Sequence, residues 1–248
     1  MATAPGQGVI GAQERPVVLA LDSAGSGCSV VVAAGETVLG AERLATMHGQ
    51  AERLLPMVDA VMRKAGLSAS ALDFVGTTIG PGSFTGVRVG LAAARGIALA
   101  TRARLIGVTG FEAVAAGLAP SADNRGAGFV LVALESRRED LYIQIFDHTQ
   151  RPLGDPTAAM PAALNGVLYE ILGAAPLLVA GDAAQRAANI LSRRPGTTVA
   201  EDSAPDAAGV LRAVLRHRRL GRRDVKPLPL YLRPPDVTLS TAFQRTGR

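Results

Sequence analysis

The segment Gly80–Gly90 holds the residues of this sequence that are best suited to bind a ligand. It reads Gly-Pro-Gly-Ser-Phe-Thr-Gly-Val-Arg-Val-Gly and follows the apolar run Phe74–Ile79, an order that predicts a strand, a rigid turn and a helix. Backbone N–H groups at such a helix start, beside a strand end, commonly bind ligands in α/β proteins. This is not a Walker A loop, because no Gly-Lys-Ser/Thr follows and the only lysines are Lys64 and Lys226. The residues of interest are Gly80, Pro81, Gly82, Ser83, Phe84, Thr85, Gly86, Arg88 and Gly90.

Histidine and cysteine are too few and too scattered to predict a metal centre. No two of His48, His148 and His217 have the i, i+4 spacing that places two ligands on one helix face, and Cys28 is the only cysteine. We therefore expect no metal site, and Cys28 in its apolar run is typical of a small core residue. A serine hydrolase is not indicated either, because no Gly-x-Ser-x-Gly elbow is present. The candidate serine nucleophiles are Ser23, Ser29 and Ser83.

A dense basic run lies between residues 212 and 226, where seven arginines and lysines are opposed only by Asp224. Such a run can neutralise phosphates, or it can be a solvated helix end whose arginines complement the helix dipole. The sequence leaves both interpretations open. Because no aromatic residue is interleaved, base-specific reading of RNA is not predicted. The candidate phosphate contacts are Arg212, Arg216, Arg219, Arg222 and Arg223.

Composition predicts a globular protein with an aliphatic core. The 248 residues are 48% hydrophobic but only 4% aromatic, so Ala, Val, Leu and Ile must fill the interior. A single cysteine excludes an internal disulfide and fits a reducing compartment. Residues 1–15 lack an apolar stretch typical of a signal peptide, and no run of about 20 apolar residues suggests a membrane span. We expect a soluble cytoplasmic protein.

Strands and helices alternate along most of the chain. The expected strands are Val17–Asp22, Cys28–Ala34, a strand reaching about Ala45, Phe74–Ile79, Leu105–Thr109, Phe129–Glu135, Leu141–Asp147 and Ala174–Gly181. The expected helices are Gln50–Ala65, a helix from the glycine loop to about Arg102, Gly110–Leu118, Asp182–Leu191 and Ala204–His217. A polar break is expected over Pro120–Gly128.

The first two helices have unusual surfaces. The apolar residues of the first sweep an arc of about 160°, whereas one-sided burial typically needs about 100°. This predicts either contact with something besides the core or a deeply set core helix, with Pro56 kinking the helix or marking its first turn. The second helix is rich in Gly and Ala, with one charged edge at Arg88, Arg95 and Arg102, which predicts burial on nearly all other sides. Its interior glycines each cost about 1 kcal/mol relative to Ala, so close packing must offset them.

Five segments together resemble one known family. The glycine loop closely resembles the signature of the bacterial TsaB (YeaZ) family, an accessory subunit in making threonylcarbamoyladenosine in tRNA. The other four, which agree in order and spacing, are Leu19–Ala24, Glu52–Met57, Leu105–Val108 and Pro229–Arg233. The resemblance covers roughly residues 16–235, and only the glycine loop is specific by itself.

The resemblance implies a duplicated α/β fold of the actin-like and Hsp70-like (ASKHA, RNase H-like) class, with two lobes of mixed sheet plus helices. Residues 16–109 with 204–235 would form the first lobe and 110–203 the second, with a disordered tail at 1–15 and a flexible tail at 236–248. In such folds a carboxylate after the first strand serves the nucleotide's metal, which makes Asp22, Ser23 and Gly25 a candidate vestigial nucleotide site. The second phosphate loop is incomplete, because Ala183 follows Asp182 where Gly is usual. The glycine-loop helix start could instead be sealed by packing.

The resemblance also implies a non-catalytic protein that needs partners. The expected partner is a TsaD-type catalytic subunit, held through a four-helix bundle, and a TsaE-type ATPase would engage the pair. ATP would be used by the partners, and tRNA would bind through the complex, with the basic run as a candidate contact. A homodimer of the isolated chain is left open. The expected interface residues are Leu54, Leu55, Val58, Val61, Met62, Gly90, Ala93, Ala94 and Ile97.

Two departures from relatives bear on activity. The TsaD relatives bind their metal through a His-x-x-x-His pair, which this sequence lacks. Many TsaB relatives carry His where this chain has Gln50, so a metal role there is not expected. The alternative interpretation is a self-sufficient enzyme of the same superfamily, either an ATP-dependent enzyme or a glycoprotease-like peptidase.

Overall fold

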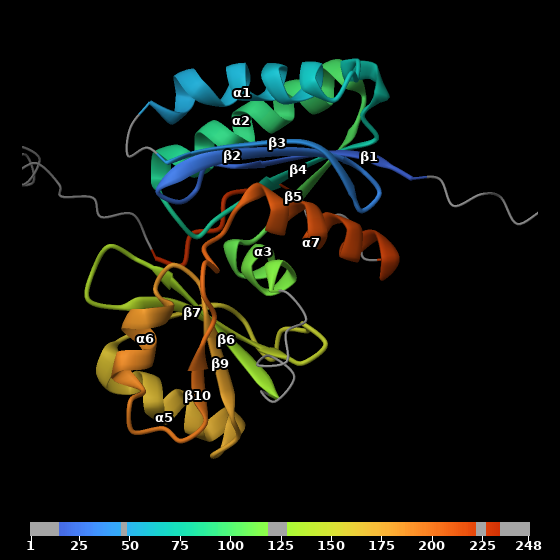
Figure 1. Ribbon diagram of the computed structural model, residues 1–248. Coiled ribbons are helices and arrows are strands. Elements are labelled where there is room, and N and C mark those ends of the chain that lie inside the picture. Colours follow the sequence, from blue (N-terminus) through green and yellow to red (C-terminus); the bar gives the residue numbers. More distant parts are fainter. Residues whose placement is uncertain (1–14, 46–48, 119–127, 222–226, 234–248) are drawn as a thin grey trace, which may run out of the picture.

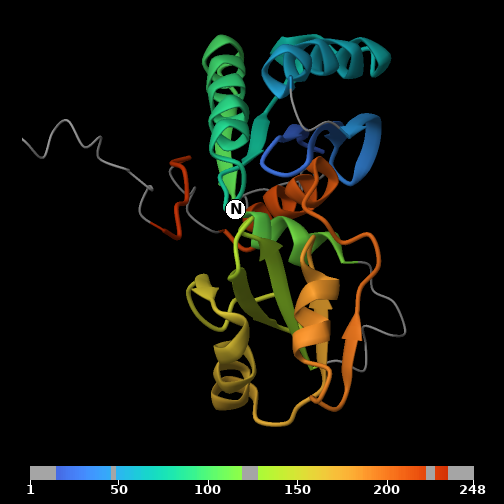
Figure 2. The same ribbon diagram turned by 90° about the vertical axis from the view of Figure 1, so that its left-hand side faces the viewer.

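The structure is a computed structural model of the 248-residue chain and describes residues 15–45, 49–118, 128–221 and 227–233 (Figure 1). Two five-stranded sheets are stacked with helices above, between and below them (Figures 1 and 2). The expected tails at 1–15 and 236–248 and the expected break at 120–128 fall wholly or almost wholly outside the described residues. No helix in the described part of the chain combines the length and apolarity needed to cross a bilayer.

The first sheet has the strand order β3-β2-β1-β4-β5. Its strands are β1 (Val17–Asp22), β2 (Gly27–Ala34), β3 (Thr37–Ala45), β4 (Phe74–Thr78) and β5 (Arg104–Val108). The pairs β1–β2 and β2–β3 are antiparallel, whereas β1–β4 and β4–β5 are parallel. Tight turns join the antiparallel strands, and the parallel strands need helical crossovers.

Helices cover both faces of the first sheet, so its central strand is apolar on both sides. Val18 and Ala20 of β1 pack in a cluster with α7, while Leu19 and Leu21 pack in a cluster with α1 and α2. This is why β1 reads as a continuous apolar run rather than an alternating one. The covering helices are α1 (Gln50–Lys64), α2 (Phe84–Thr101) and α7 (Ala207–Arg219).

The second sheet repeats the topology of the first. Its order is β10-β9-β6-β7-β8, with β6–β7 and β7–β8 antiparallel and β6–β9 and β9–β10 parallel. Read from the other edge, the strands follow the same order and directions as those of the first sheet. The strands are β6 (Phe129–Glu135), β7 (Leu141–Asp147), β8 (Thr157–Ala159), β9 (Leu177–Ala180) and β10 (Thr197–Val199). The helices packed on its outer face are α5 (Pro161–Leu172) and α6 (Ala184–Ile190).

A shared helical layer joins the two sheets. Helix α3 (Gly110–Gly117) packs Phe111 and Val114 against the second sheet, and its Ala113 joins the cluster of α7 and the first sheet. Figure 2 shows α3 and α7 between the two sheets. A Cβ at Gly209 of α7 would overlap the Ala113 carbonyl, so glycine there permits the close approach of the two helices.

A buried polar pair reinforces this layer. His217 of α7 is 5% exposed, and its Nε2 lies 3.0 Å from Oε1 of Glu112 on α3. Glu112 also completes a capping box, accepting from the Thr109 N–H at 3.0 Å. Burial by itself would raise the pKa of Glu112, but the hydrogen bonds from His217 and Thr109 lower it overall. The carboxylate is therefore held ionised, and the imidazole is the donor.

Most of the expected elements are confirmed at close to their expected bounds. The strands Phe129–Glu135 and Leu141–Asp147 are confirmed residue for residue, and the helix expected over Gln50–Ala65 runs from Gln50 to Lys64. Helix α5 and the short strands β8 and β10 were not expected from the sequence. The two strands are only three residues long and carry little pattern.

One expected helix boundary is wrong, and so is one of the two alternatives for Pro56; the other, a kink in α1, stays a prediction. The last helix begins at Ala207 rather than Ala204, because the Asp206 side chain caps it by accepting from the Gly209 N–H at 2.7 Å, and it continues to Arg219. Pro56 does not mark the first turn of α1, since the helix begins six residues earlier at Gln50 and continues past the proline.

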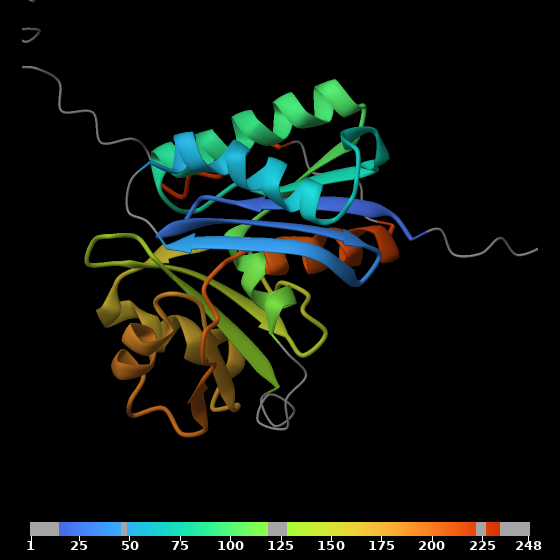
Figure 3. The same ribbon diagram turned by 45° about the horizontal axis from the view of Figure 1, so that its top comes forward.

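The expected burial of α2 on nearly all sides is also wrong. Only six of its eighteen residues are buried, and Leu99 is 85% exposed. The helix rests on the sheet with one face, while α1 lies beside it rather than over it (Figure 3). Ala92, Gly96 and Leu99 on the outer side of α2 are therefore exposed, whereas residues 227–233 contact the helix only through its neighbouring side chains, Arg88 and Arg95 among them.

Replacing His217 with Leu should lower the free energy of unfolding by about 1–3 kcal/mol, because Glu112 would keep a buried charge without its donor. Chemical denaturation at pH 7 measures the change. His148→Leu is the matched control, since His148 is exposed. Equal stability of the two variants would contradict a stabilising role for the His217–Glu112 pair.

Candidate functional site

The glycine loop faces inward, toward the turn that follows β1. Ser83 is the N-cap of α2 and accepts from the Gly86 N–H at 3.3 Å. The Ser83 N–H donates to the Ala24 carbonyl at 2.8 Å, and the Ser23 hydroxyl donates to the Gly86 carbonyl at 2.8 Å. The N–H groups of Ser83 and Gly86 at the start of α2 are thus satisfied within the chain, whereas Phe84 and Thr85 between them are exposed.

Close backbone approach explains three glycines of this loop. A Cβ at Gly82 would overlap the Ala24 carbonyl oxygen, and one at Gly86 would overlap that of Ser23. At Gly90 a Cβ would lie 2.7 Å from the Ser23 hydroxyl oxygen. These contacts give the loop a packing role, since any larger residue would push α2 away from the turn after β1.

A segment from far along the chain lies against the other side of the loop. The Leu230 N–H donates to the Ile79 carbonyl at 2.7 Å, directly before the cis peptide bond Gly80–Pro81. The guanidinium of Arg88 lies over the Phe84 ring at 3.5 Å, and its Nε donates to the hydroxyl of Tyr231 at 3.2 Å. Residues 227–233 therefore contact α2 and help to hold it in place. The glycine loop and Pro229–Arg233, two of the five segments that resemble the TsaB family, meet here.

The candidate nucleotide residues are divided between the interior and a cleft. Asp22 is 4% exposed and accepts from the Thr78 hydroxyl at 2.5 Å. Burial raises the pKa of Asp22 to about 6, although the hydrogen bonds from Thr78 and Ala24 oppose the rise. Ser23 is buried as well, whereas Gly25 lines a cavity of about 440 Å³ between the lobes.

This interlobe cavity has acidic groups on its second-lobe side. Glu135 and Asp182 both line it, and Asp182 accepts from the Glu135 N–H at 2.9 Å. Burial raises the pKa of Asp182, and the nearby Glu135 carboxylate acts in the same direction. Arg186 neutralises Glu135 through a 2.9 Å ion pair. The lining therefore combines two carboxylates with Arg137 and several polar groups.

Each candidate serine nucleophile already has a structural hydrogen bond. Besides the bonds of Ser23 and Ser83 described above, the Ser29 hydroxyl accepts from the Ala207 N–H at 2.8 Å. Among the described residues, no group of three His, Cys, Asp or Glu side chains could hold a metal ion. Gln50 is buried at the start of α1, and His48 lies outside the described residues.

The expected interface residues do not form one surface. Five of the nine, namely Leu54, Val61, Met62, Gly90 and Ala94, are buried inside this chain, so their side chains cannot meet a partner as expected. They lie on the sides of α1 and α2 that pack against the first sheet and the turn after β1. Leu55 is 52% exposed, while Val58, Ala93 and Ile97 are partly exposed.

An outer surface on the same two helices combines Leu55 and Val58, which the sequence analysis expected at an interface, with three residues of α2 that it did not single out. We call it the α1–α2 outer face and define it by Leu55, Val58, Ala92, Gly96 and Leu99. No atom lies within 4 Å of a Cβ built on Gly96, so this glycine has no packing role inside the chain. In the sequence, Ala92, Gly96 and Leu99 have the i, i+4, i+7 spacing that places them on one side of a helix. The spacing alone could not show that this side faces outward.

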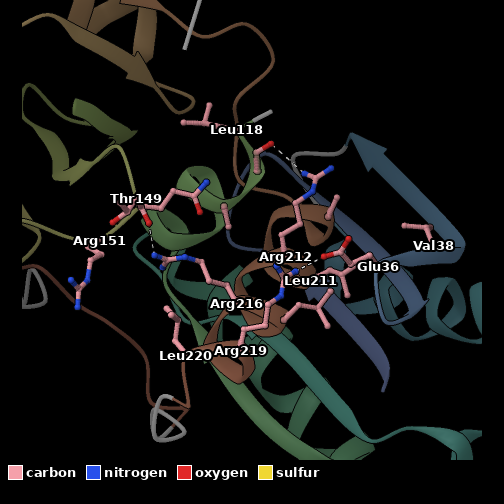
Figure 4. A pocket seen from close by; sticks show the side chains of 15 residues that line it. Glu36, Val38, Leu118, Thr149, Arg151, Leu211, Arg212, Arg216, Arg219 and Leu220 are labelled. Carbon is pink, nitrogen blue, oxygen red and sulfur yellow. Dashed lines mark hydrogen bonds and ion pairs between the residues drawn. The ribbon is translucent and has the colours of Figure 1, made fainter. Parts of the chain in front are cut away.

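The basic run of α7 lines a second, larger cavity of about 1080 Å³ (Figure 4). Arg212 donates to the Gly117 carbonyl at 3.3 Å, Arg216 donates to the Thr149 carbonyl at 2.6 Å, and Arg219 is ion-paired with Glu36. Arg222 and Arg223 lie outside the described residues.

Two copies of one five-stranded topology, joined through a shared helical layer, define the class of this protein as a duplicated, actin-like α/β fold. Residues 45–188 match the family model described as TsaD, tRNA N6-adenosine threonylcarbamoyltransferase. The chain belongs to this family, and within it to the TsaB (YeaZ) group.

Individual relatives agree with this assignment. The chain is 34% identical over 125 residues to the tRNA threonylcarbamoyladenosine biosynthesis protein TsaB of Escherichia coli K12, a match that covers 50% of this chain and 52% of the relative. In this match the chain spans about half the length of the curated relative. It is 30% identical to the uncharacterized protein Rv3421c of Mycobacterium tuberculosis over 89% of this chain and 93% of that protein. The solved structure of YeaZ from Pseudomonas aeruginosa superimposes with a TM-score of 0.71 at 25% identity, covering 88% of this chain and 100% of that one.

Two glycines of the same helix should respond in opposite ways to alanine. Gly86→Ala should destabilise the chain by about 1–3 kcal/mol, because the added methyl overlaps the Ser23 carbonyl. Gly96→Ala should stabilise the isolated chain by up to about 1 kcal/mol, because it meets open space and improves helix propensity. Thermal and chemical denaturation of both variants tests this contrast, and destabilisation by Gly96→Ala would show an internal packing role for Gly96.

Asp22→Asn should stabilise the chain at neutral pH. Since the pKa of Asp22 is raised on folding, the folded state binds the proton more tightly, and wild-type stability falls as pH rises from about 4 through about 6. The variant should gain about 1–3 kcal/mol at pH 7.5 and about nothing at pH 4. Denaturation curves at the two pH values measure the difference, and a loss of stability at pH 7.5 would mean that the Asp22 charge is needed for folding.

Proposed function

We propose that this chain is a non-catalytic subunit that forms a heterodimer with a TsaD-type catalytic subunit. In that pair, the catalytic subunit transfers the threonylcarbamoyl group to the adenosine beside the anticodon of tRNA. Membership of the TsaB (YeaZ) group supports the assignment to threonylcarbamoyladenosine synthesis. The observation that carries the partner is the α1–α2 outer face, which the described part of the chain leaves uncovered.

The chemistry of this face suits helix-on-helix packing. Leu99 is 85% exposed and Leu55 is 52% exposed, so burying them in a partner would remove apolar surface from water. Gly96 and Ala92 are small, and small side chains let helix axes approach to the shorter end of the usual distance of about 8–10 Å. A helical glycine with no neighbour of its own is unfavourable by about 1 kcal/mol, and a closely packed partner helix would offset that.

Charged residues border this apolar stripe. Arg88 and Arg95 lie on α2 and are exposed, but each is anchored to the segment 227–233, Arg95 by donating to the Pro227 carbonyl at 2.5 Å. Interfaces commonly combine an apolar centre with a polar rim in which arginine is enriched. We infer that Leu55, Val58, Ala92, Gly96 and Leu99 form the centre, together with the partly exposed Ala93 and Ile97.

A non-catalytic role is supported by the glycine loop. The N–H groups of Ser83 and Gly86, two of those that could bind a phosphate or an oxyanion at this helix start, already have acceptors within the chain. The sequence also lacks the His-x-x-x-His pair of the catalytic relatives. We assign ATP use to the partner subunits, including a TsaE-type ATPase, and place the complex and its tRNA in the cytoplasm. Without a partner, the same α1–α2 outer face could pair two copies of this chain.

An ATP-dependent enzyme is the second candidate, because the 440 Å³ interlobe cavity is large enough for a small ligand and is lined by Gly25 and Ser26. Calorimetric titration with magnesium-ATP discriminates between the two functions. Submicromolar binding with ATP hydrolysis by the isolated chain would favour the enzyme, and would place catalysis in this cavity. A peptidase has no such support, since all three candidate serines are held by structural hydrogen bonds.

Enlarging Gly96 should weaken the heterodimer. Gly96→Leu would prevent close helix approach, and we expect the dissociation constant for the TsaD-type subunit to rise at least about tenfold, or about 1.4 kcal/mol. The matched control is Gly166→Leu on α5, because Gly166 is also exposed, helical and without atoms within 4 Å of its built Cβ. Calorimetry or analytical ultracentrifugation gives both constants.

Leu99→Ser should also weaken the heterodimer without lowering the stability of the isolated chain, because Leu99 is exposed. Tyr169→Ser on α5, 63% exposed in wild type, is its control. If Gly96→Leu and Leu99→Ser bind the TsaD-type subunit as tightly as wild type, the interface does not lie on the α1–α2 outer face.

A further inference from the structure

The cavity beside α7 gathers positive charge from two distant parts of the chain. Arg212, Arg216 and Arg219 come from one helix, and Arg151 comes from the turn after β7 (Figure 4). Glu36 supplies the only carboxylate in the lining among the described residues. Four guanidinium groups and one carboxylate leave a strong positive excess around a single cavity of about 1080 Å³.

The helix presents its arginines in line. Their i, i+4, i+7 spacing places Arg212, Arg216 and Arg219 on one side of α7 over about 10 Å of helix. At a solvated helix end, water would hydrate each arginine separately. Here Arg151, from the turn after β7, lines the same cavity as the three arginines of α7. This arrangement suits a ligand that carries several negative charges in a row.

Contacts with carbonyl groups hold two of these guanidinium groups in place. Arg212 is fixed by the Gly117 carbonyl and Arg216 by the Thr149 carbonyl. Because a guanidinium has five N–H donors, the hydrogen bond of Arg212 to Gly117 leaves other donors for an anion. Side chains that are already ordered lose less entropy when they bind.

The cavity is separate from the surfaces used so far. Glu36 lies in the β2–β3 turn, next to the pair Val17–Ala34 at the start of β1, whereas Gly25 and the glycine loop lie at the other end of β1. The α1–α2 outer face lies on the opposite side of the first sheet from α7 (Figure 1). A partner bound to α1 and α2 would therefore leave this cavity open.

We infer that the α7 cavity binds the phosphate backbone of tRNA. The inference rests on the proposed function, which makes tRNA the relevant polyanion, and it adds a docking site to a subunit that performs no chemistry. No aromatic side chain lines the cavity among the described residues, so it contacts the backbone and reads no base sequence. Its contribution is to hold and orient tRNA while the catalytic subunit reacts with one adenosine.

Binding of fluorescently labelled tRNA to the full chain, measured by anisotropy between about 50 and 200 mM salt, tests this inference. The cavity variant is Arg151→Gln, Arg212→Gln, Arg219→Gln, which keeps the interlobe contact of Arg216. The control variant is Arg53→Gln, Arg63→Gln, Arg193→Gln, which removes the same net charge from exposed positions outside the cavity. Both must retain the thermal stability of wild type.

We expect the cavity variant to bind tRNA at least about tenfold more weakly, with a salt slope shallower by about 2–3, and the control variant to stay near wild type. Glu36→Gln removes the only carboxylate and should tighten binding, a gain that no folding defect can produce. Equal weakening by both triple variants, no weakening by either, or no effect of Glu36→Gln would overturn the inference. The assay contains no TsaD-type subunit, so its failure would leave the heterodimer proposal to its own binding test.

Discussion

The close approach of two backbone segments, the start of α2 and the turn after β1, sets the geometry of the first lobe. Gly82, Gly86 and Gly90 allow this approach, and hydrogen bonds of Ser23 and Ser83 close it. The contact has two consequences. It occupies the Ser83 N–H at the start of α2, and it fixes which side of α2 faces the sheet. The outer side, with Gly96 and Leu99, is then presented to solvent.

The molecule separates its surfaces by layer. The α1–α2 outer face is apolar and lies on one side of the first sheet, whereas the arginine-lined cavity lies beside α7 on the other side. Between the lobes, α3 and α7 are joined by close packing at Gly209 and by the buried His217–Glu112 pair. If both proposals hold, a protein partner on the α1–α2 outer face and a polyanion in the α7 cavity would bind on opposite sides of the first sheet, without competing for the same surface.

Sequence patterns predicted the elements of the fold better than the surfaces. Strand β6 is a nearly continuous apolar run and β7 is mostly apolar around Gln144, and such runs are recognisable without knowing what covers them. Periodicity could not tell the core side of α1 and α2 from the outer side, because apolar residues lie on both. Leu54 and Leu55 are neighbours in sequence, yet one is buried and the other is half exposed.

The glycines of α2 show the same limit. Gly86 in the first turn of α2 and Gly96 in its interior both belong to a helix rich in small residues. One meets the Ser23 carbonyl and the other meets open space, a difference that depends on where a distant turn packs. The convergence of Arg151 with the arginines of α7 was equally hidden, since more than sixty residues separate them in the chain.

The most direct test of the account is a titration of this chain into a reconstituted tRNA threonylcarbamoylation reaction. The mixture holds the TsaD-type subunit, its ATPase partner, tRNA and a threonylcarbamoyl-adenylate source, and the chain is added as wild type or as Gly96→Leu. If the chain acts through the α1–α2 outer face, no product forms without it, and the variant needs a higher concentration to reach the same maximal rate. Product formation without the chain, or a lowered maximal rate with an unchanged half-saturating concentration, would contradict the account.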